Sequence, residues 1–204
     1  QHLSKILKEK ILGNTITFDV DFGENWEGIF RAHPWLDGPK DSYLGYINKG
    51  GGALSEHSHA LNLWQHISEI SGSGDIIEIQ PIFKFNSSGK LHYDEIAMLN
   101  IKTDKTIGRV VQDVVTSPHT KIAKIICEKG SIEWICNYEN NSDRIIIKKK
   151  DNEEFLDFKK SREDDFLQEV KYVNNCVQNN IKENDISFSK GLKTFLWIEK
   201  CFSS

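Results

Sequence analysis

The sequence predicts an α+β domain built on an open, predominantly antiparallel β-sheet with its helices packed on one face. From Asp75 onward, short apolar or alternating runs are separated only by tight turn sequences, which is typical of antiparallel neighbours. Segments with helical periodicity precede and follow these runs, and no strand–helix–strand alternation interrupts them. A chain of 204 residues, 38% of them hydrophobic, can bury a core of its own.

The N-terminal part of the chain predicts a helix, a strand and a long irregular connection. Apolar residues recur at helical spacing as far as Leu12, and Gly13-Asn14 is typical of a helix end. Residues 15–22 alternate between apolar and polar, the period of a strand with one buried face. The connection over residues 23–49 is long enough to serve a function.

The remaining elements follow from the same periodicities. Residues 53–70 predict one helix, with Ala53, His57, Ala60 and Trp64 on a shared face. Six strands are expected, at 76–85, 92–101, 106–115, 121–127, 131–136 and 144–147. The tail predicts two helices: one has an apolar stripe made of Phe166, Val170, Val173 and Val177, and the last docks back on an earlier element.

Composition excludes several classes of function. The net charge of −4 comes without a polybasic block, which argues against a nucleic-acid partner. No apolar run approaches the roughly 20 residues that span a bilayer, so no membrane partner is expected either. The four cysteines fit neither a zinc pattern nor a disulfide framework, and we expect a soluble, cytoplasmic protein. Because the chain begins inside a predicted helix and has a single methionine, Met98, we expect that an N-terminal part is missing.

The residues with chemical potential cluster between Gly50 and Trp64. On a helix, Ser55, His59 and Asn62 fall on one face, and Glu56 lies within reach of His59 at the i, i+3 spacing. Such a polar row indicates a candidate site, although His59 could also be a hydrogen-bonded core residue. The three glycines at 50–52 could cradle a phosphate, but they lack the Lys and Ser/Thr of a P-loop, which favours close packing of a loop instead.

Two other readings of the polar residues remain open. His57 and His59 could bind a metal only on a strand, because positions i and i+2 of a helix point about 200° apart. His57 shares its face with apolar residues, which favours a buried, hydrogen-bonded role. His33, Trp35 and Asp37 could line a binding pocket, whereas the proline beside them favours a rigid loop that packs Trp35 into the core.

The segment Gly-Gly-Gly-Ala-Leu, followed by Glu56, Ser58-His59 and Asn62, resembles a segment of the Gfo/Idh/MocA oxidoreductase family, Gly-Gly-Gly-x-Leu-x-Asp-x-Ser-His-x-x-Asp. The stretch that holds His33-Pro34-Trp35, Asp37 and Asp41-Ser42-Tyr43 is similar to the preceding loop of members linked to surface-sugar metabolism. Residues 191–200 resemble the final helix of the family. The resemblance covers nearly the whole chain, 1–204, as a single C-terminal domain.

This resemblance implies a substrate-binding and dimerisation domain whose Rossmann domain is absent. NAD or NADP would bind mainly to that missing domain, which would also supply a lysine, so cofactor-binding residues cannot be named. His59 matches the active-site histidine of the family, and Glu56 and Asn62 stand where aspartates are usual. Other branches place the acid one residue earlier, at Ser55.

The implied reaction involves a hydroxyl of a sugar, polyol or nucleotide-sugar. Hydride removal from a secondary alcohol requires loss of the hydroxyl proton, which an imidazole can accept near neutral pH. We therefore assign His59 to the reacting hydroxyl and Glu56 to its support, with Ser55, Asn62, His33, Trp35 and Asp37 as substrate-binding candidates and no metal. The open sheet face should be apolar and pair with a second copy. The alternatives are a non-catalytic binding or assembly module, which Asn62 favours, and a metal hydrolase.

Overall fold

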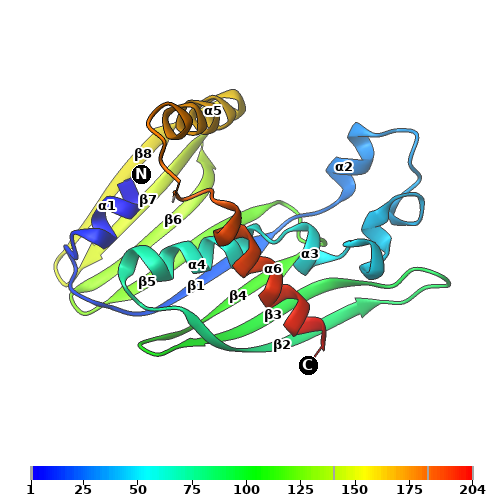
Figure 1. The fold of residues 1–204 in the computed structure, drawn as a ribbon, viewed down its shortest axis with the longest axis horizontal. Helices are drawn as coiled ribbons and strands as arrows, with labels where there is room; N and C mark the ends of the chain where they lie inside the picture. The colour runs from blue at the N-terminus through cyan, green and yellow to red at the C-terminus, as the bar shows by residue number, and fades with distance from the viewer. Residues whose placement is uncertain (1, 140, 183, 204) are drawn as a thin grey trace.

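The computed structural model describes residues 2–139, 141–182 and 184–203, and its centre is one eight-stranded sheet (Figure 1). Its strands are β1 (Thr15–Gly23), β2 (Ile76–Asn86), β3 (Tyr93–Thr103), β4 (Ile107–Asp113), β5 (Thr120–Cys127), β6 (Gly130–Glu139), β7 (Ser142–Lys149) and β8 (Asn152–Lys159). They lie in the order β2-β3-β4-β1-β5-β6-β7-β8. This arrangement confirms the predicted open, mostly antiparallel sheet.

Strand β1 occupies the middle of the sheet although it comes first in the chain. It pairs in parallel with β4, where Val20 lies opposite Val110. On its other side it pairs antiparallel with β5, where Phe22 lies opposite Lys121. The remaining neighbours are antiparallel, as the short turns between them require. Residues far apart in the sequence therefore meet at the end of β1.

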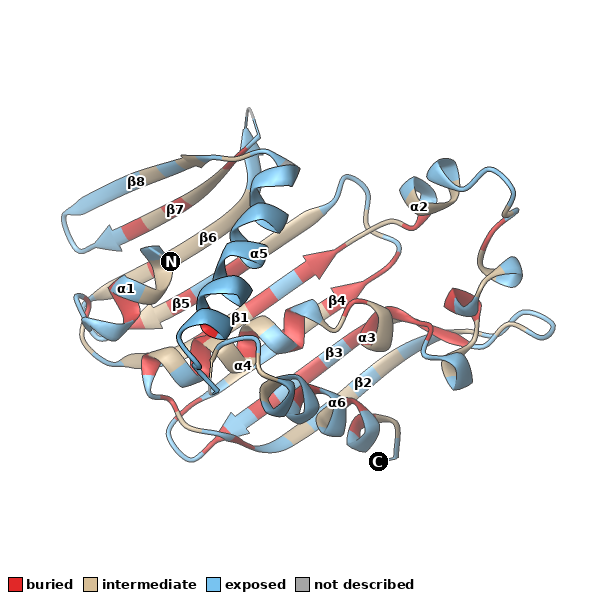
Figure 2. Cartoon of the chain, turned by 45° about the horizontal axis from the view of Figure 1, so that its top comes forward, coloured by how far each residue is buried: buried red, intermediate tan, exposed pale blue. Residues whose placement is uncertain are grey.

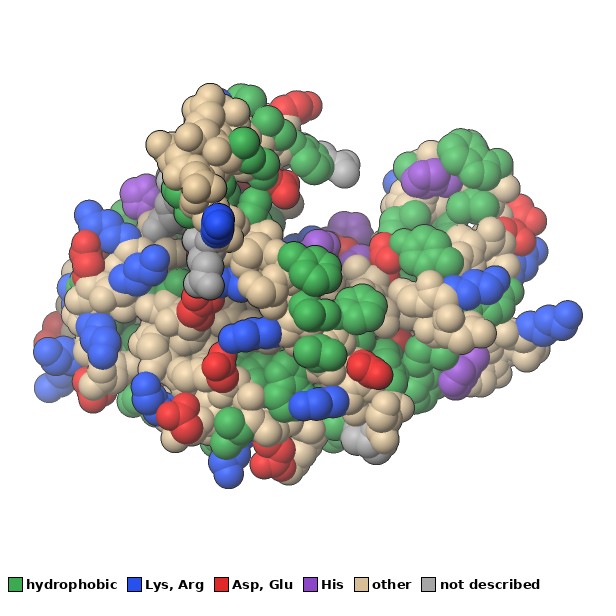
Figure 3. All heavy atoms as spheres, viewed as in Figure 1, with side chains coloured by type: hydrophobic (Ala, Val, Ile, Leu, Met, Phe, Trp, Pro, Cys, Tyr) green, Lys and Arg blue, Asp and Glu red, His purple; other side chains and the backbone are tan. Residues whose placement is uncertain are grey.

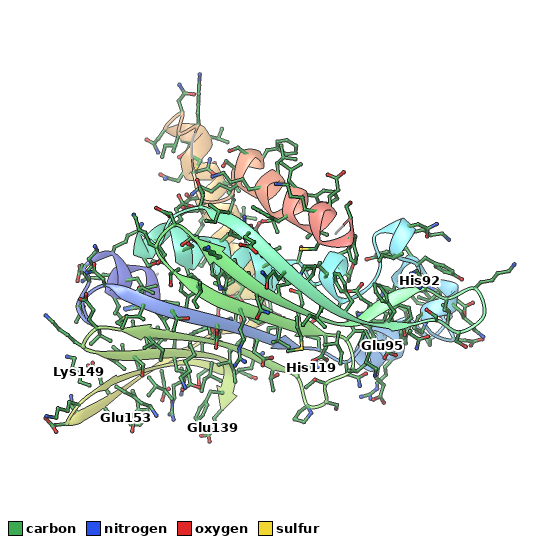
Figure 4. All side chains as sticks on the ribbon, turned by 90° about the horizontal axis from the view of Figure 1, so that it is seen from below. His92, Glu95, His119, Glu139, Lys149 and Glu153 are labelled. Carbon is green, nitrogen blue, oxygen red and sulfur yellow. The ribbon has the colours of Figure 1, made fainter. Side chains whose placement is uncertain are left out.

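The helices cover one side of the sheet, which Figure 4 shows in a view turned from that of Figure 1. They are α1 (His2–Lys8), α2 (Glu27–Ala32), α3 (Ala53–Glu56), α4 (His59–Ser71), α5 (Arg162–Gln178) and α6 (Phe188–Ser203). Three short 3-10 turns, Pro39–Asp41, Tyr43–Gly45 and Ile47–Lys49, shape the connection between α2 and α3. None of the described helices is both long and apolar enough to cross a bilayer.

Trp64 of α4 is the centre of the core between helices and sheet. Its side chain is fully buried, and its ring stacks on Phe18 of β1 with 4.4 Å between the ring centroids. The indole Nε1 donates a hydrogen bond of 3.2 Å to the carbonyl oxygen of Phe18. Figure 2 shows the buried residues concentrated along the central strands below α4. This contact fixes the position of α4 on the sheet.

The predicted final helix and its docking are confirmed. Phe202 of α6 stacks on Phe83 of β2 with ring centroids 4.9 Å apart, and Thr194 accepts a hydrogen bond from Asn62 of α4. The helix α5 also forms, with Ser161 and Asp164 in a capping box at its start. Its apolar stripe is exposed, however, with Val170 at 64% and Val177 at 74% (Figure 2).

Three predictions need correction. Strand β8 was not predicted, because polar residues fill most of this edge strand. The single helix over 53–70 is two helices, since His57 leaves the α conformation with φ −98° and ψ 37°. Trp35 is 73% exposed and lies edge-on to the His33 ring, so the loop does not pack it into the core.

The uncovered face of the sheet is a mixture of apolar and charged side chains, rather than uniformly apolar as expected. A row of apolar residues crosses it, from Ile82 and Met98 through Val111 to Ile122 and Ile135. Asp21 interrupts this row, and the adjacent row includes the Arg109–Asp19 ion pair at 3.1 Å. The face therefore has apolar patches within a polar surface.

Candidate active site

The break between α3 and α4 brings two histidines to the end of β1 in different surroundings. His57 is buried, with 8% of its surface exposed, whereas His59 at the start of α4 is exposed. The segment that joins them is not an extended strand, so it lacks the geometry that a shared metal ion would require. Within the parts of the chain that the structure describes, no group of three His, Cys, Asp or Glu side chains could hold a metal ion.

Both ring nitrogens of His57 are hydrogen bonded. Nε2 accepts from the indole Nε1 of Trp26 at 3.0 Å, and Nδ1 lies 2.8 Å from Oε2 of Glu24. Because an indole N–H can only donate, the His57 proton must be on Nδ1, where it is donated to Glu24. The sequence-based expectation of a buried, hydrogen-bonded His57 is therefore confirmed.

Glu24 connects this histidine to a lysine on a neighbouring strand. Its second carboxylate oxygen, Oε1, forms an ion pair with Nζ of Lys121, the β5 residue opposite Phe22. The hydrogen bond from His57 is the largest cause that lowers the pKa of Glu24 to about 2, and burial opposes it. Glu24 is therefore an ionised carboxylate at neutral pH. Sequence reasoning missed Glu24 and Lys121, since only the pairing of β1 with β5 brings them together.

His59 is the accessible member of the cluster. Its pKa is lowered from the ordinary value of 6.5, first by partial burial of the ring, although the residue as a whole is exposed to solvent. The positive charge of Lys121 lowers this pKa further, whereas Glu24 and Glu56 raise it. His59 is accordingly a neutral imidazole at neutral pH, which can accept a proton.

Glu56 is held by a tyrosine. The Tyr43 hydroxyl donates a hydrogen bond of 2.6 Å to Oε2 of Glu56, and this bond is the main reason that the pKa of Tyr43 rises to about 12. Glu56 is close enough to affect the pKa of His59, but the structure records no hydrogen bond between them. Tyr43 belongs to the loop that the sequence placed beside the site.

Two of the three glycines, Gly51 and Gly52, pack a loop closely against the site, as the sequence favoured. A Cβ on Gly51 would collide with the backbone carbonyl of Leu44, and a Cβ on Gly52 would collide with the carboxylate of Asp94. Gly52 also has a φ of +94°, which other residues rarely adopt. Oδ2 of Asp94 accepts a 2.7 Å hydrogen bond from the backbone N–H of Leu54, in the first turn of α3. A buried carboxylate from β3 thus fixes where α3 begins.

Asp94 should make stability depend on pH. It is fully buried, and burial raises its pKa from 3.8 to about 6 against the opposing effect of backbone hydrogen bonds. A folded pKa above the unfolded value means that the folded state binds more protons, so stability falls as pH rises from about 4 to about 6. Two pKa units correspond to a loss of about 3 kcal/mol. We expect Asp94→Asn to remove most of this loss in urea unfolding at pH 4, 5, 6 and 7.

The matched control is Asp151→Asn, in the exposed turn between β7 and β8. This variant should keep the pH dependence of the wild-type chain. An Asp94→Asn variant whose stability still falls by the wild-type amount between pH 4 and pH 6 would contradict the assignment to Asp94.

The remaining sequence-predicted residues are only partly brought together. Ser55 lies on α3 beside Glu56 and is half-buried. Asn62 points to α6, where its Nδ2 donates to Oγ1 of Thr194 at 3.1 Å. His33 and Asp37 are exposed on the loop after α2. His33 is hydrogen bonded to the backbone oxygen of Ile29, and Asp37 forms an ion pair with Lys40. Among the described residues, no recorded contact joins either of them to His59.

A cavity of about 540 Å³ lies further along α4, lined in part by Asn62, His66 and Lys190. Two of its three lining lysines are neutralised, because Lys190 pairs with Glu69 and Asp185 and Lys193 pairs with Asp75. We place the candidate site at His59 instead, where an accessible imidazole and a buried charge network meet. Figure 3 shows this end of the molecule as a hollow between α5 and the α2 loop, with histidine side chains at its floor.

No protein-family model matches the sequence, and no curated protein matches it. Solved structures do match the fold. An oxidoreductase from Agrobacterium radiobacter, in complex with NAD+, L-tartaric acid and magnesium, has a TM-score of 0.75 and 16% identity, over 100% of this chain and 58% of its own. The aldose-aldose oxidoreductase from Caulobacter crescentus, complexed with glycerol, has a TM-score of 0.73 and 13% identity, over 98% of this chain and 56% of its own. A 3-ketoreductase from Actinomadura kijaniata in complex with NADP has a TM-score of 0.69 and 10% identity, over 99% of this chain and 56% of its own.

These matches identify the class of fold: an open, mostly antiparallel sheet with helices on one side, as in NAD(P)-dependent oxidoreductases. This shared fold is the one that the sequence resemblance predicted, and the described residues of the chain contain no Rossmann domain. The chain spans between 56% and 58% of the length of the three structures named above.

Proposed function

We propose that this chain is the substrate-binding and subunit-pairing domain of an NAD(P)-dependent oxidoreductase that acts on a hydroxyl of a sugar, polyol or nucleotide-sugar. The observation that best supports this proposal is the accessible, neutral imidazole of His59, whose pKa responds to the charges of the nearby Glu56, Glu24 and Lys121. A cytoplasmic location agrees with the four free cysteines.

In this proposal His59 handles the proton of the reacting hydroxyl. Its neutral imidazole accepts the proton as the alcohol is oxidised and returns it in the reverse direction. Glu56, held by Tyr43, stands near enough to stabilise the imidazolium that forms. Ser55 lies on the same short helix and is a candidate to bind a neighbouring hydroxyl. NAD(P) would supply the hydride acceptor or donor, and we assign no residue of this chain to it.

The nucleotide-binding domain would sit over the hollow. The exposed apolar stripe of α5 and the exposed Phe188 and Phe195 of α6 lie on the helix-covered side of the sheet, where a second domain would bury them. His33, Trp35 and Asp37 would then be candidates to line the rim of the sugar pocket. The chain on its own should show no dehydrogenase turnover, because the cofactor site lies outside it.

The direct test is NAD(P)-dependent turnover by the full-length protein that contains this chain, over a panel of cyclic polyols and sugars. Cofactor binding with reduction of NAD(P) by at least one compound would support the proposal. A full-length protein that binds neither cofactor nor sugar would instead be a non-catalytic binding or assembly module, and turnover by residues 1–204 alone would also contradict the proposal.

The uncovered sheet face is proposed to pair two copies of the chain. Its apolar row includes Ile82, which is 61% exposed, and Met98, which is 43% exposed, and a symmetric contact would bury this row against itself. We expect the chain to elute as a dimer in size-exclusion chromatography with light scattering, and the double change Ile82→Lys with Met98→Lys to give a monomer. The double change Val170→Lys with Val177→Lys on α5 is the control and should leave the dimer intact. A monomeric wild-type chain at high concentration would contradict this pairing.

A further inference from the structure

Lys121 is a charged group of the His59 cluster that the proposed reaction has not used. Its side chain leaves β5 on the helix-covered side of the sheet, since the register pairs it with Phe22, which faces that side and is buried. Its side chain is 30% exposed, and its charge acts on His59. The ammonium therefore lies at the boundary between the buried network and solvent.

The hydrogen bonds below Lys121 have only one possible direction. Trp26 donates to His57, His57 donates to Glu24, and Glu24 accepts from Lys121 through its other oxygen. An ammonium has three N–H donors, and among the described residues Glu24 is the only hydrogen-bond acceptor recorded for it. At least one donor of Lys121 thus remains for a molecule bound near His59.

We propose that Lys121 binds a hydroxyl oxygen of the substrate at the His59 site, and that Glu24, His57 and Trp26 are positioning residues that hold its ammonium in place. The inference rests on the proposed oxidoreductase function and deepens it. Trp26 is itself held in place, because it is buried and packs on Tyr93 with ring centroids 5.2 Å apart.

The charges of the cluster also indicate the substrate class. The positive charge of Lys121 is balanced by Glu24, His59 is neutral at neutral pH, and Glu56 adds a negative charge. The cluster as a whole has no excess positive charge with which to attract a phosphate or carboxylate. The group bound at His59 and Lys121 is therefore a neutral, hydroxyl-bearing sugar or polyol ring.

The test compares steady-state kinetics of the full-length protein and its variants Lys121→Met, Lys121→Arg, Glu24→Gln and Lys124→Met. The substrates are glucose, glucose 6-phosphate, myo-inositol and glycerol. Loss of a hydrogen bond from a charged donor should raise KM about 10- to 100-fold in Lys121→Met. The value of kcat should change much less, because this hydrogen bond forms equally in the ground state and the transition state. Lys121→Arg should restore most of the affinity. Glu24→Gln should raise KM as well, since it frees the ammonium from its anchor.

Lys124→Met is the matched control, since Lys124 lies on the same strand but faces the uncovered side, opposite Asp19. Its KM should equal that of the wild type. Thermal unfolding of each variant separates a loss of binding from a loss of fold, and histidine NMR titration of the 204-residue chain should show a higher His59 pKa in Lys121→Met but not in Lys124→Met.

The outcomes distinguish the two proposals. A wild type that binds neither cofactor nor any sugar, polyol or nucleotide-sugar removes the proposed function and this inference with it. A wild type that turns over normally, with an unchanged KM in Lys121→Met, removes this inference alone. A wild type that uses glucose 6-phosphate better than glucose overturns the neutral substrate class.

Discussion

Replacement of His59 by alanine is expected to lower kcat of the full-length oxidoreductase by about 100- to 10,000-fold, the usual contribution of a positioned general base. Cofactor affinity should be unchanged, because the nucleotide would bind to another domain. The imidazole belongs to an exposed residue and has a lowered pKa, so it is the group of this cluster best able to exchange a proton with a bound alcohol. Steady-state kinetics with the best compound of the sugar panel measures the effect.

The pH dependence of activity is a second test of the role of His59. Alcohol oxidation requires the unprotonated imidazole, so activity should be lost as pH falls through the pKa of His59. Because this pKa lies below the ordinary 6.5, the acidic limb of kcat/KM should also lie below pH 6.5. His92→Ala is the control, since this histidine (labelled in Figure 4) stacks on Phe85 on the strand β2, away from the site. Equal kcat values for the wild type and His59→Ala would refute the assignment.

Trp64→Ala is expected to destabilise the chain by about 3–5 kcal/mol, the cost of removing a large aromatic side chain from a packed core. The fully buried indole stacks on Phe18 and donates a hydrogen bond to its carbonyl oxygen. The change therefore leaves a cavity and removes this hydrogen bond. A domain of this kind has a total stability of about 5–15 kcal/mol, so a large share would be lost. Urea unfolding followed by circular dichroism measures the difference in midpoint.

Two further variants calibrate this loss. Trp35→Ala removes an indole that is 73% exposed, and surface changes of this kind usually stay within about 0.5 kcal/mol. Trp64→Phe keeps most of the ring volume and should lose less than Trp64→Ala. If Trp64→Ala and Trp35→Ala had the same midpoint, Trp64 would not be the contact that fixes α4 on the sheet.

Much of the fold could be predicted from local periodicity. Alternation identified β1 and the runs between Ile76 and Ile147, because each of these strands buries one face. The polar edge strand β8 gave no such signal. The central position of β1 could not be predicted either, because its partners lie about a hundred residues away and nothing local selects them.

The candidate site, like the fold, could be predicted only where its residues lie close together in the sequence. His57, His59 and Glu56 were found because they lie close together in the sequence, in a segment that resembles a known family. Glu24 and Lys121 were missed because only the register of β1 with β5 brings them together. The break at His57 was missed as well, since its cause is tertiary: the ring is tied to Trp26 and Glu24. Local sequence thus found the proton-handling residue but not the network beneath it.

The place of β1 in the sheet has a consequence for how the chain folds. Strands β2 to β4 and strands β5 to β8 are each joined to their neighbours by short turns, so each group can form from local contacts. Only β1 connects the two groups, and it pairs with residues 90 or more positions away, such as Thr17 with Ile107. Closing such long loops is slow, because the chain loses entropy before the contacts compensate for it. Folding of the whole sheet should therefore wait for β1 to enter the gap, and the residues that complete the His59 cluster are assembled in this last step.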